Sequence, residues 1–155
     1  MTVNKLYFAQ HGLAVDKAEN PDRPLSASGI KQTEWVATHL NKQHVTISQI
    51  VHSGKLRASQ TAAIFAEQLN ASTTSAVDYL SPNSDISIIT ALLDTSDTLY
   101  VGHLPHLNKL TSTLLTGDEN KGIIHFQNSG VLCLERALQN YQVKWYFVPT
   151  QLALA

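Results

Sequence analysis

Short apolar runs bounded by polar residues alternate along this chain with longer segments of helical periodicity. The short runs carry the β-branched and large apolar side chains that pack inside a sheet, and the last two are separated only by a polar stretch, which predicts a closing β-hairpin. The predicted strands are Lys5–Ala9, Ile47–His52, a short one near Val77, Thr98–Gly102, Val131–Arg136 and Val143–Val148.

The segments between these strands have the apolar spacing and the capping residues of amphipathic helices. In the first of them Ile30, Ala37 and Leu40 fall roughly on one face, which predicts that this face packs against the sheet. Serine, aspartate and proline favour the starts of helices, and glycine and asparagine favour their ends. The predicted helices are Ile30–Leu40, a helix from Ser53 as its N-cap to about Leu69 that Asn70 ends, one begun by Ser84 or Asp85, and Pro105–Leu115 capped by Gly117.

Strands separated by helices predict a three-layer α/β sandwich. Its central sheet is expected to be mostly parallel, with helices on both faces and the hairpin as an antiparallel edge. A chain of 155 residues suits one compact domain with a single core, so we expect one domain over residues 1–155.

Composition and charge narrow the classes of partner. The formal net charge is −1 with no block of like charges, so a nucleic-acid partner is not expected. Cys133 is the only cysteine, and the N-terminal apolar run is too short for a signal peptide or a membrane span. We therefore expect a reduced, cytoplasmic protein that has no disulfide and does not enter a membrane.

Polar residues follow three of the predicted strands. Gln10 and His11 follow the first strand, the stretch from Ser53 to Arg57 follows the second, and His103 follows the third. Ligands of such sheets bind beyond the carboxyl ends of the strands, where helix N-termini favour anions. The guanidinium of Arg57 is a planar donor suited to phosphate oxygens. The sequence therefore predicts two imidazoles and a guanidinium around a bound anion.

These groups are suited to nucleophilic phosphoryl transfer. A neutral imidazole attacks phosphorus when its other nitrogen is held as a donor, and water then hydrolyses the phosphohistidine that forms. His103 and His106 also have an H-x-x-H spacing, which raises the alternative of a zinc site. Because no glutamate motif or cysteine ligand accompanies them, we expect no metal and no cofactor.

At these residues the sequence resembles the histidine phosphatase superfamily, and in particular its short bacterial phosphohistidine phosphatases of the SixA type. The resemblance covers nearly the whole chain, and its strength comes from five motifs in the expected order. These are Gln10-His11-Gly12 in place of Arg-His-Gly, Arg23-Pro24-Leu25-Ser26 with Gly29, Ser53 with Arg57-Ala58 and Gln60-Thr61, Leu80-x-Pro82-x-x-Asp85, and Gly102-His103-Leu104-Pro105.

The resemblance implies a phosphoglycerate mutase-like fold and a role for each matching residue. It implies that His11 is the nucleophile, and that Arg57 and His103 bind the phosphoryl group and stabilise the transition state. It implies neither metal nor cofactor, and a monomer. The residues that it implies for substrate binding are Gln10, Gly12, Arg23, Ser53 and Leu104.

Gln10 stands where the family has an arginine, so one cationic donor is missing. A single donor to a developing negative charge is worth ~3 to 4 kcal/mol, or on the order of a hundredfold to a thousandfold in rate. We therefore expect reduced activity, unless Arg23 or Lys55 supplies the charge.

The chain also lacks an evident proton donor. Leu104 follows the second histidine, and Tyr79 precedes the Leu-x-Pro element where an acid is common. Without such an acid a phosphate ester is a poor substrate, whereas a phosphoramidate bond to imidazole needs little acid catalysis, although Asp85 or a water could still serve. We therefore expect a phosphorylated histidine phosphotransfer protein as substrate. The alternatives are a phosphatase for a small phosphorylated metabolite, and a module that binds phosphate without turnover.

Overall fold

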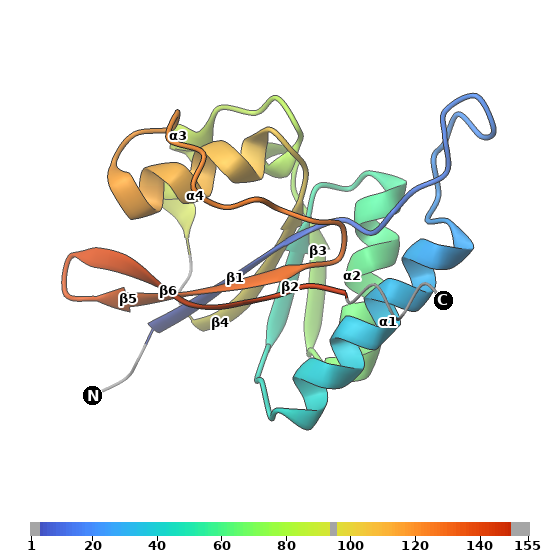
Figure 1. The fold of residues 1–155 in the computed structure, drawn as a ribbon, viewed down its shortest axis with the longest axis horizontal. Coiled ribbons are helices and arrows are strands. Elements are labelled where there is room, and N and C mark those ends of the chain that lie inside the picture. The colour runs from blue at the N-terminus through green and yellow to red at the C-terminus, as the bar shows by residue number, and fades with distance from the viewer. Residues whose placement is uncertain (1–3, 94–95, 150–155) are drawn as a thin grey trace.

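A six-stranded mixed sheet forms the centre of the computed structural model, which describes residues 4–93 and 96–149 (Figure 1). The strand order is β3-β2-β4-β1-β5-β6. The first four strands of the chain run parallel to one another, and β5 pairs antiparallel with both β1 and β6. The strands are β1 (Asn4–Gln10), β2 (Gln49–His52), β3 (Thr73–Ala76), β4 (Ser96–Gly102), β5 (Val131–Ala137) and β6 (Asn140–Phe147).

Helices cover both faces of the sheet, which confirms the three-layer α/β sandwich. Figure 1 shows α1 and α2 on one face and α3 and α4 on the other. Alternate residues of β1 serve the two faces: Tyr7 and Ala9 pack with α1 and α2, whereas Leu6 and Phe8 pack with α3 and α4. The helices are α1 (Ala27–Lys42), α2 (Leu56–Leu69), α3 (Ile86–Leu92) and α4 (His106–Thr116), with a 3₁₀ turn at Asp78–Leu80.

Three predicted helix caps are confirmed. Asn70 ends α2 in the left-handed conformation, with φ of 56°, and Gly117 ends α4 with φ of 81°. Asp85 caps α3, where its carboxylate accepts a hydrogen bond from the backbone N–H of Ser87 at 2.9 Å. Asn70 and Gly117 thus set the ends of two helices, and Asp85 sets the start of a third.

Two helix starts differ from the prediction. Helix α1 begins at Ala27 rather than Ile30, because the Ser26 hydroxyl accepts from the N–H of Gly29 and caps a turn earlier. The buried stripe of α1 is centred on other positions, so Ile30 lies at its border and is 39% exposed. Helix α2 begins at Leu56, with Lys55 rather than Ser53 at its N-cap position. The buried residues of α1 are Gly29, Gln32, Thr33, Val36, Ala37 and Leu40.

The strand ends also differ in detail. Strand β3 ends at Ala76, so Val77 lies just beyond it, and the hairpin turn is only Leu138 and Gln139 because β5 and β6 extend toward each other. The expected domain of residues 1–155 includes 1–3, 94–95 and 150–155, which lie outside the described residues. Within the described ranges, none of the helices combines the length and apolarity that crossing a membrane requires.

Candidate active site

The residues expected at the site follow three adjacent strands. In the sheet Gln10 at the end of β1 is in register with Gly102 at the end of β4, and β2 ends beside β4. His11, Ser53 and His103 therefore leave the same edge of the sheet. The backbone N–H of His11 donates to the carbonyl of Gly102 at 3.0 Å, and the imidazole centroids of His11 and His103 lie 4.9 Å apart.

The backbone sets the tautomer of His11. Its Nδ1 lies 2.7 Å from the carbonyl oxygen of Gly12, which can only accept, so Nδ1 carries the hydrogen. The other ring nitrogen, Nε2, therefore keeps its lone pair. The imidazole is held in the form that a nucleophile needs.

The loop that carries His11 is fixed from both helix α2 and the segment before β5. The N–H of Gly12 donates to the Thr61 hydroxyl at 2.8 Å, and the amide of Asn128 donates to the His11 carbonyl at 2.9 Å. A Cβ atom at Gly12 would come within 2.8 Å of the Thr33 hydroxyl and 3.0 Å of the Ser129 hydroxyl. Glycine is thus required here by close packing rather than by its dihedral angles.

Ser53 contacts the second imidazole instead of capping a helix. Its hydroxyl lies 2.6 Å from Nε2 of His103, and both groups are buried. The same hydroxyl accepts weakly from the N–H of Lys55 at 3.3 Å. The N-cap role predicted for Ser53 is wrong because this hydroxyl is bound to a residue that follows a different strand.

Cations surround the two imidazoles. Burial, together with the nearby charges of Arg57 and Arg23, lowers the pKa of His11 to about 4, against the raising effect of the Gly12 carbonyl. Burial, together with His11, Arg57 and Lys55, likewise lowers the pKa of His103 to about 3. Both imidazoles are therefore neutral at pH 7, and the site is a region of positive potential suited to an anion.

Arg23 is held toward this region by its own loop. Its backbone is left-handed, with φ of 49°, and its Nε donates to the carbonyl of Val15 at 3.1 Å. Its charge acts on both His11 and Arg57 and lowers the pKa of each. The loop itself is attached to α2, because the N–H of Leu25 donates to the Gln60 amide oxygen at 2.7 Å.

Several side chains of the site carry buried polar atoms that lack a hydrogen-bond partner among the described residues. They include Oε1 of Gln10, Nε of Arg57 and Nδ1 of His103. Buried polar atoms of folded proteins are nearly always paired, and exceptions gather where a ligand binds or chemistry occurs. Of these atoms, Nε of Arg57 is a donor and agrees with the anion site that the cations indicate, whereas Oε1 of Gln10 is an acceptor and does not bind an anion.

The structure also shows positioning residues that no sequence motif indicates. Asn128 and Ser129 bind the backbone of His11 and Gln10 from a segment without a recognisable motif. His106 at the start of α4 and His52 at the end of β2 are both buried, with exposed fractions of 1% and 9%. Among the residues that the structure describes, no three histidine, cysteine, aspartate or glutamate side chains are grouped as metal ligands.

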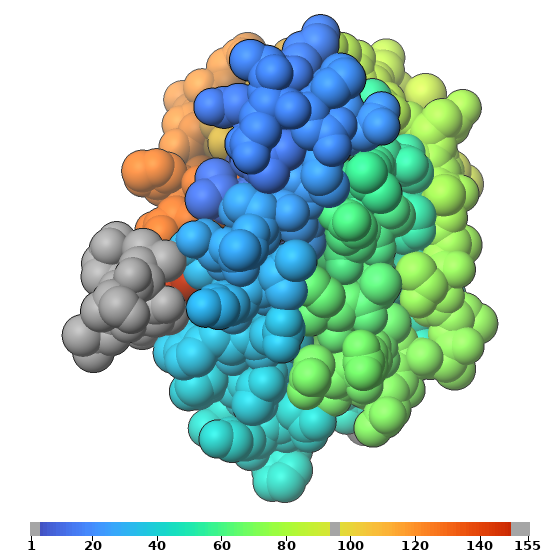
Figure 2. Space-filling view, turned by 90° about the vertical axis from the view of Figure 1, so that its right-hand side faces the viewer, coloured from blue at the N-terminus to red at the C-terminus, as the bar shows by residue number. Residues whose placement is uncertain are grey.

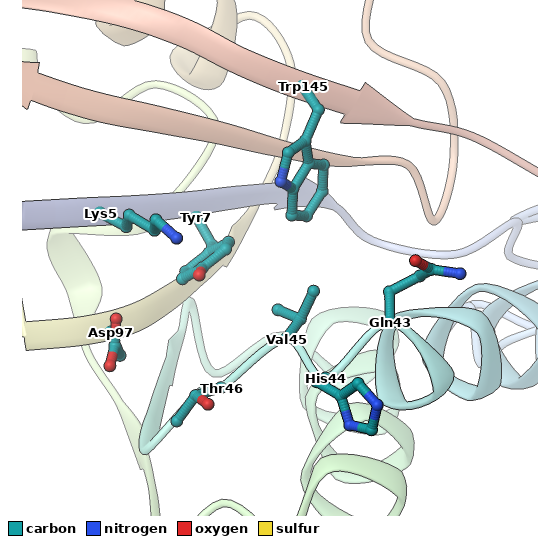
Figure 3. A pocket seen from close by; sticks show the side chains of 8 residues that line it. All are labelled: Lys5, Tyr7, Gln43, His44, Val45, Thr46, Asp97 and Trp145. Carbon is teal, nitrogen blue, oxygen red and sulfur yellow. The ribbon is translucent and has the colours of Figure 1, made fainter. Parts of the chain in front are cut away.

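A cavity of about 370 Å³ lies at the opposite end of the strands (Figure 3). Lys5 and Asp97 line it from the starts of β1 and β4, together with Trp145 of β6. His11 and His103 instead follow the carboxyl ends of β1 and β4. Figure 2 shows the segment after β1, in blue, gathered at one end of the molecule beside α2, in green. The cavity and the candidate site are therefore separate features.

The lowered pKa values of the buried histidines predict a loss of stability in acid. In the unfolded chain they bind protons below their ordinary pKa of 6.5, whereas folded His11 and His103 do so only below about 4 and 3. The unfolded state thus binds more protons between pH 6.5 and 4, so the free energy of unfolding falls as pH falls through this window. Urea unfolding from pH 7 to 4 measures it, and His103→Gln is expected to flatten the curve. If the free energy of unfolding depended on pH equally in the variant and in the unmodified chain, the loss of stability in acid would not come from His103.

Comparisons with known proteins agree with this geometry. A family model described as the histidine phosphatase superfamily (branch 1) matches residues 6–79. The phosphohistidine phosphatase SixA of Escherichia coli is 29% identical over 122 residues, which cover 74% of this chain and 76% of that protein. An uncharacterized protein of Picosynechococcus is 28% identical, covering 89% of this chain and 88% of that protein. A structure of the protein histidine phosphatase SixA complexed with tungstate superposes with a TM-score of 0.82 at 26% identity, covering 96% of this chain and 99% of the other.

Proposed function

We propose that this chain is a phosphatase of the histidine phosphatase superfamily and that its substrate is phosphohistidine carried on a phosphotransfer protein. In this proposal His11 is the nucleophile, Arg57 and His103 are catalytic ligands of the phosphoryl group, and Gln10, Gly12, Arg23, Ser53 and Leu104 contribute to substrate binding. Neither a metal nor a cofactor takes part. The names of the SixA relatives, and the tungstate oxyanion in one of their structures, support this assignment.

In the first step Nε2 of His11 attacks phosphorus. The new P–N bond forms as the P–N bond to the substrate imidazole breaks, and that imidazole leaves with a proton taken from solvent. The hydrogen bond from Nδ1–H of His11 to the Gly12 carbonyl, 2.7 Å long, stabilises the positive charge that develops on the ring. Arg57, Arg23 and His103 are placed to hold the phosphoryl oxygens.

In the second step water attacks the phosphorylated His11. The P–N bond to His11 breaks, inorganic phosphate leaves, and the proton lost by water passes to the phosphate or to solvent. His11 returns to the Nδ1–H tautomer because the Gly12 carbonyl still accepts from it. The site is then ready for another substrate without a cofactor.

One observation carries the choice of substrate: within the described residues, none of the hydrogen bonds of His11, Ser53 and His103 goes to a carboxylate. Asp85, a candidate acid, is an N-cap whose pKa is lowered by the N–H of Ser87 that it accepts from, so it stays ionised at neutral pH. An alkoxide leaving group needs a general acid, whereas an imidazole leaving group does not. The site therefore favours cleavage of a P–N bond.

The proposal is tested by comparing phosphate release from a phosphohistidine-bearing phosphotransfer protein with release from a sugar phosphate at pH 7. A missing general acid costs about 10² to 10⁴ in rate, so we expect kcat/KM to be at least about a hundredfold higher for the phosphoprotein. Equal rates, or faster cleavage of the ester, would favour a phosphatase for small metabolites instead.

Gln10 favours a second candidate function, a module that binds phosphorylated groups without turnover. The two functions differ in what happens at His11. An enzyme transfers labelled phosphate from a phosphodonor to this residue, where it appears as acid-labile, base-stable phosphohistidine. A module only protects the donor from hydrolysis.

A further inference from the structure

Three exposed leucines stand next to the residues of the active site. Leu13 lies two positions after His11, Leu56 directly precedes Arg57, and Leu104 directly follows His103. Their exposed fractions are 43%, 40% and 41%, although the two histidines beside them are buried. Single exposed apolar residues are ordinary, but apolar residues gathered around one site indicate an interaction surface.

The three leucines belong to the segments that carry the residues of the site. Leu13 and Leu104 belong to segments whose imidazoles lie 4.9 Å apart. Leu56 starts α2, and this helix holds the His11 loop through the bond from Gly12 to Thr61. We call Leu13, Leu56 and Leu104 the leucine rim, because each is exposed and lies within two residues of His11, Arg57 or His103.

The apolar side chains of the leucine rim favour a phosphorylated protein over a small phosphorylated sugar. A sugar phosphate is covered with hydroxyl groups and gains little from apolar neighbours, because it would need hydrogen-bonding partners there. A protein surface that carries a phosphohistidine brings other side chains into contact with the rim as the phosphoryl group reaches His11. Burial of leucine against apolar side chains then adds binding free energy that a small phosphate cannot obtain.

The positive charge near the site sets a second requirement for the surface of the protein substrate. Lys55 is exposed beside Leu56, and Arg23 is half-buried near His11. The phosphoryl group neutralises only part of this positive potential, so acidic residues around the phosphohistidine would be attracted to it.

We propose that the leucine rim is the docking surface for a folded phosphoprotein whose phosphohistidine projects from an apolar patch flanked by acidic residues. This inference rests on the proposed function, and it assigns to Leu13, Leu56 and Leu104 the selection of a protein over a small phosphate.

The test is the variant Leu13→Gln/Leu56→Gln, which leaves Leu104 beside the catalytic histidine untouched. Its kcat/KM is measured on a phosphohistidine-bearing phosphotransfer protein and on phosphoramidate, which offers the same P–N bond without a protein surface. We expect a loss of about tenfold or more on the protein and less than about twofold on phosphoramidate. The matched control Leu138→Gln, at a 97% exposed leucine of the hairpin turn, is expected to change neither value.

The outcomes separate the rim from the function. Equal losses on both substrates would overturn the rim proposal, because the leucines would then serve the site itself. Unchanged cleavage of the phosphoprotein by the variant would overturn it as well. If the unmodified chain cleaved phosphoramidate but not the phosphoprotein, this result would contradict the proposed function itself. The rim proposal, which rests on that function, would then be contradicted as well.

Discussion

Replacement of His11 by alanine is expected to lower turnover by about 10⁴ to 10⁶-fold, the loss typical of removing a nucleophile. The neighbouring imidazole of His103 has its Nε2 bound to the Ser53 hydroxyl at 2.6 Å, whereas Nε2 of His11 keeps its lone pair for attack. The variant should still bind phosphate, because Arg57 and Arg23 remain. The measurement is phosphate release from a phosphohistidine-bearing phosphotransfer protein, with phosphate affinity determined in parallel.

The matched control for this prediction is His44→Ala, at an exposed histidine after α1, which should leave turnover within about twofold of the unmodified chain. Labelling with a phosphodonor gives an independent readout. Acid-labile phosphate is expected on the unmodified chain and on His44→Ala, but not on His11→Ala. If His11→Ala still carried the acid-labile label, the phosphorylated residue would not be His11, and the prediction would be contradicted.

Replacement of Gln10 by arginine is expected to raise kcat by on the order of a hundredfold to a thousandfold, because it adds a charged donor to the transferring phosphoryl group. The amide oxygen of Gln10 is buried without a partner in the described part of the chain, so its removal sacrifices no hydrogen bond. The added charge repels Arg57 and Arg23 when no anion is bound. Phosphate should therefore raise the melting temperature of Gln10→Arg more than that of the unmodified chain.

The size of the increase in kcat expected for Gln10→Arg depends on Arg23. If its guanidinium replaces the missing arginine in part, Arg23→Ala lowers kcat strongly in the unmodified chain and much less in Gln10→Arg, a coupling that a double-mutant cycle measures. Arg136→Ala, at an exposed arginine of β5, is the control and is expected to have no effect. If Gln10→Arg left kcat unchanged, the prediction that Gln10 lowers turnover would be wrong.

The sheet and its caps could be predicted from the sequence because they depend on local chemistry. A buried strand such as β1 needs only a short apolar run, and Asn70 and Gly117 end helices through their own backbone freedom. Ile30 shows the limit of this reasoning. It shares a spacing with Ala37 and Leu40, but the buried stripe of α1 is centred on other positions, so Ile30 lies at its border and is partly exposed.

Long-range contacts account for what the sequence could not predict at the site. Ser53 has the residue type and position of an N-cap, yet its hydroxyl binds an imidazole that follows a different strand. Asn128 belongs to no motif, and its contact with the His11 carbonyl appears only when the segment before β5 is placed beside β1. The motifs located the reactive groups, and the tertiary structure determines what holds them.

The position of β1 inside the sheet has a consequence for synthesis on the ribosome. The strand that leads into His11 leaves the ribosome before its neighbours β4 and β5. Until β5 pairs with it, one side of β1 is an open edge whose backbone groups are available to other chains. The nascent chain thus carries an unprotected apolar strand until β4 and β5 have been made, and the surroundings of His11 are assembled only then.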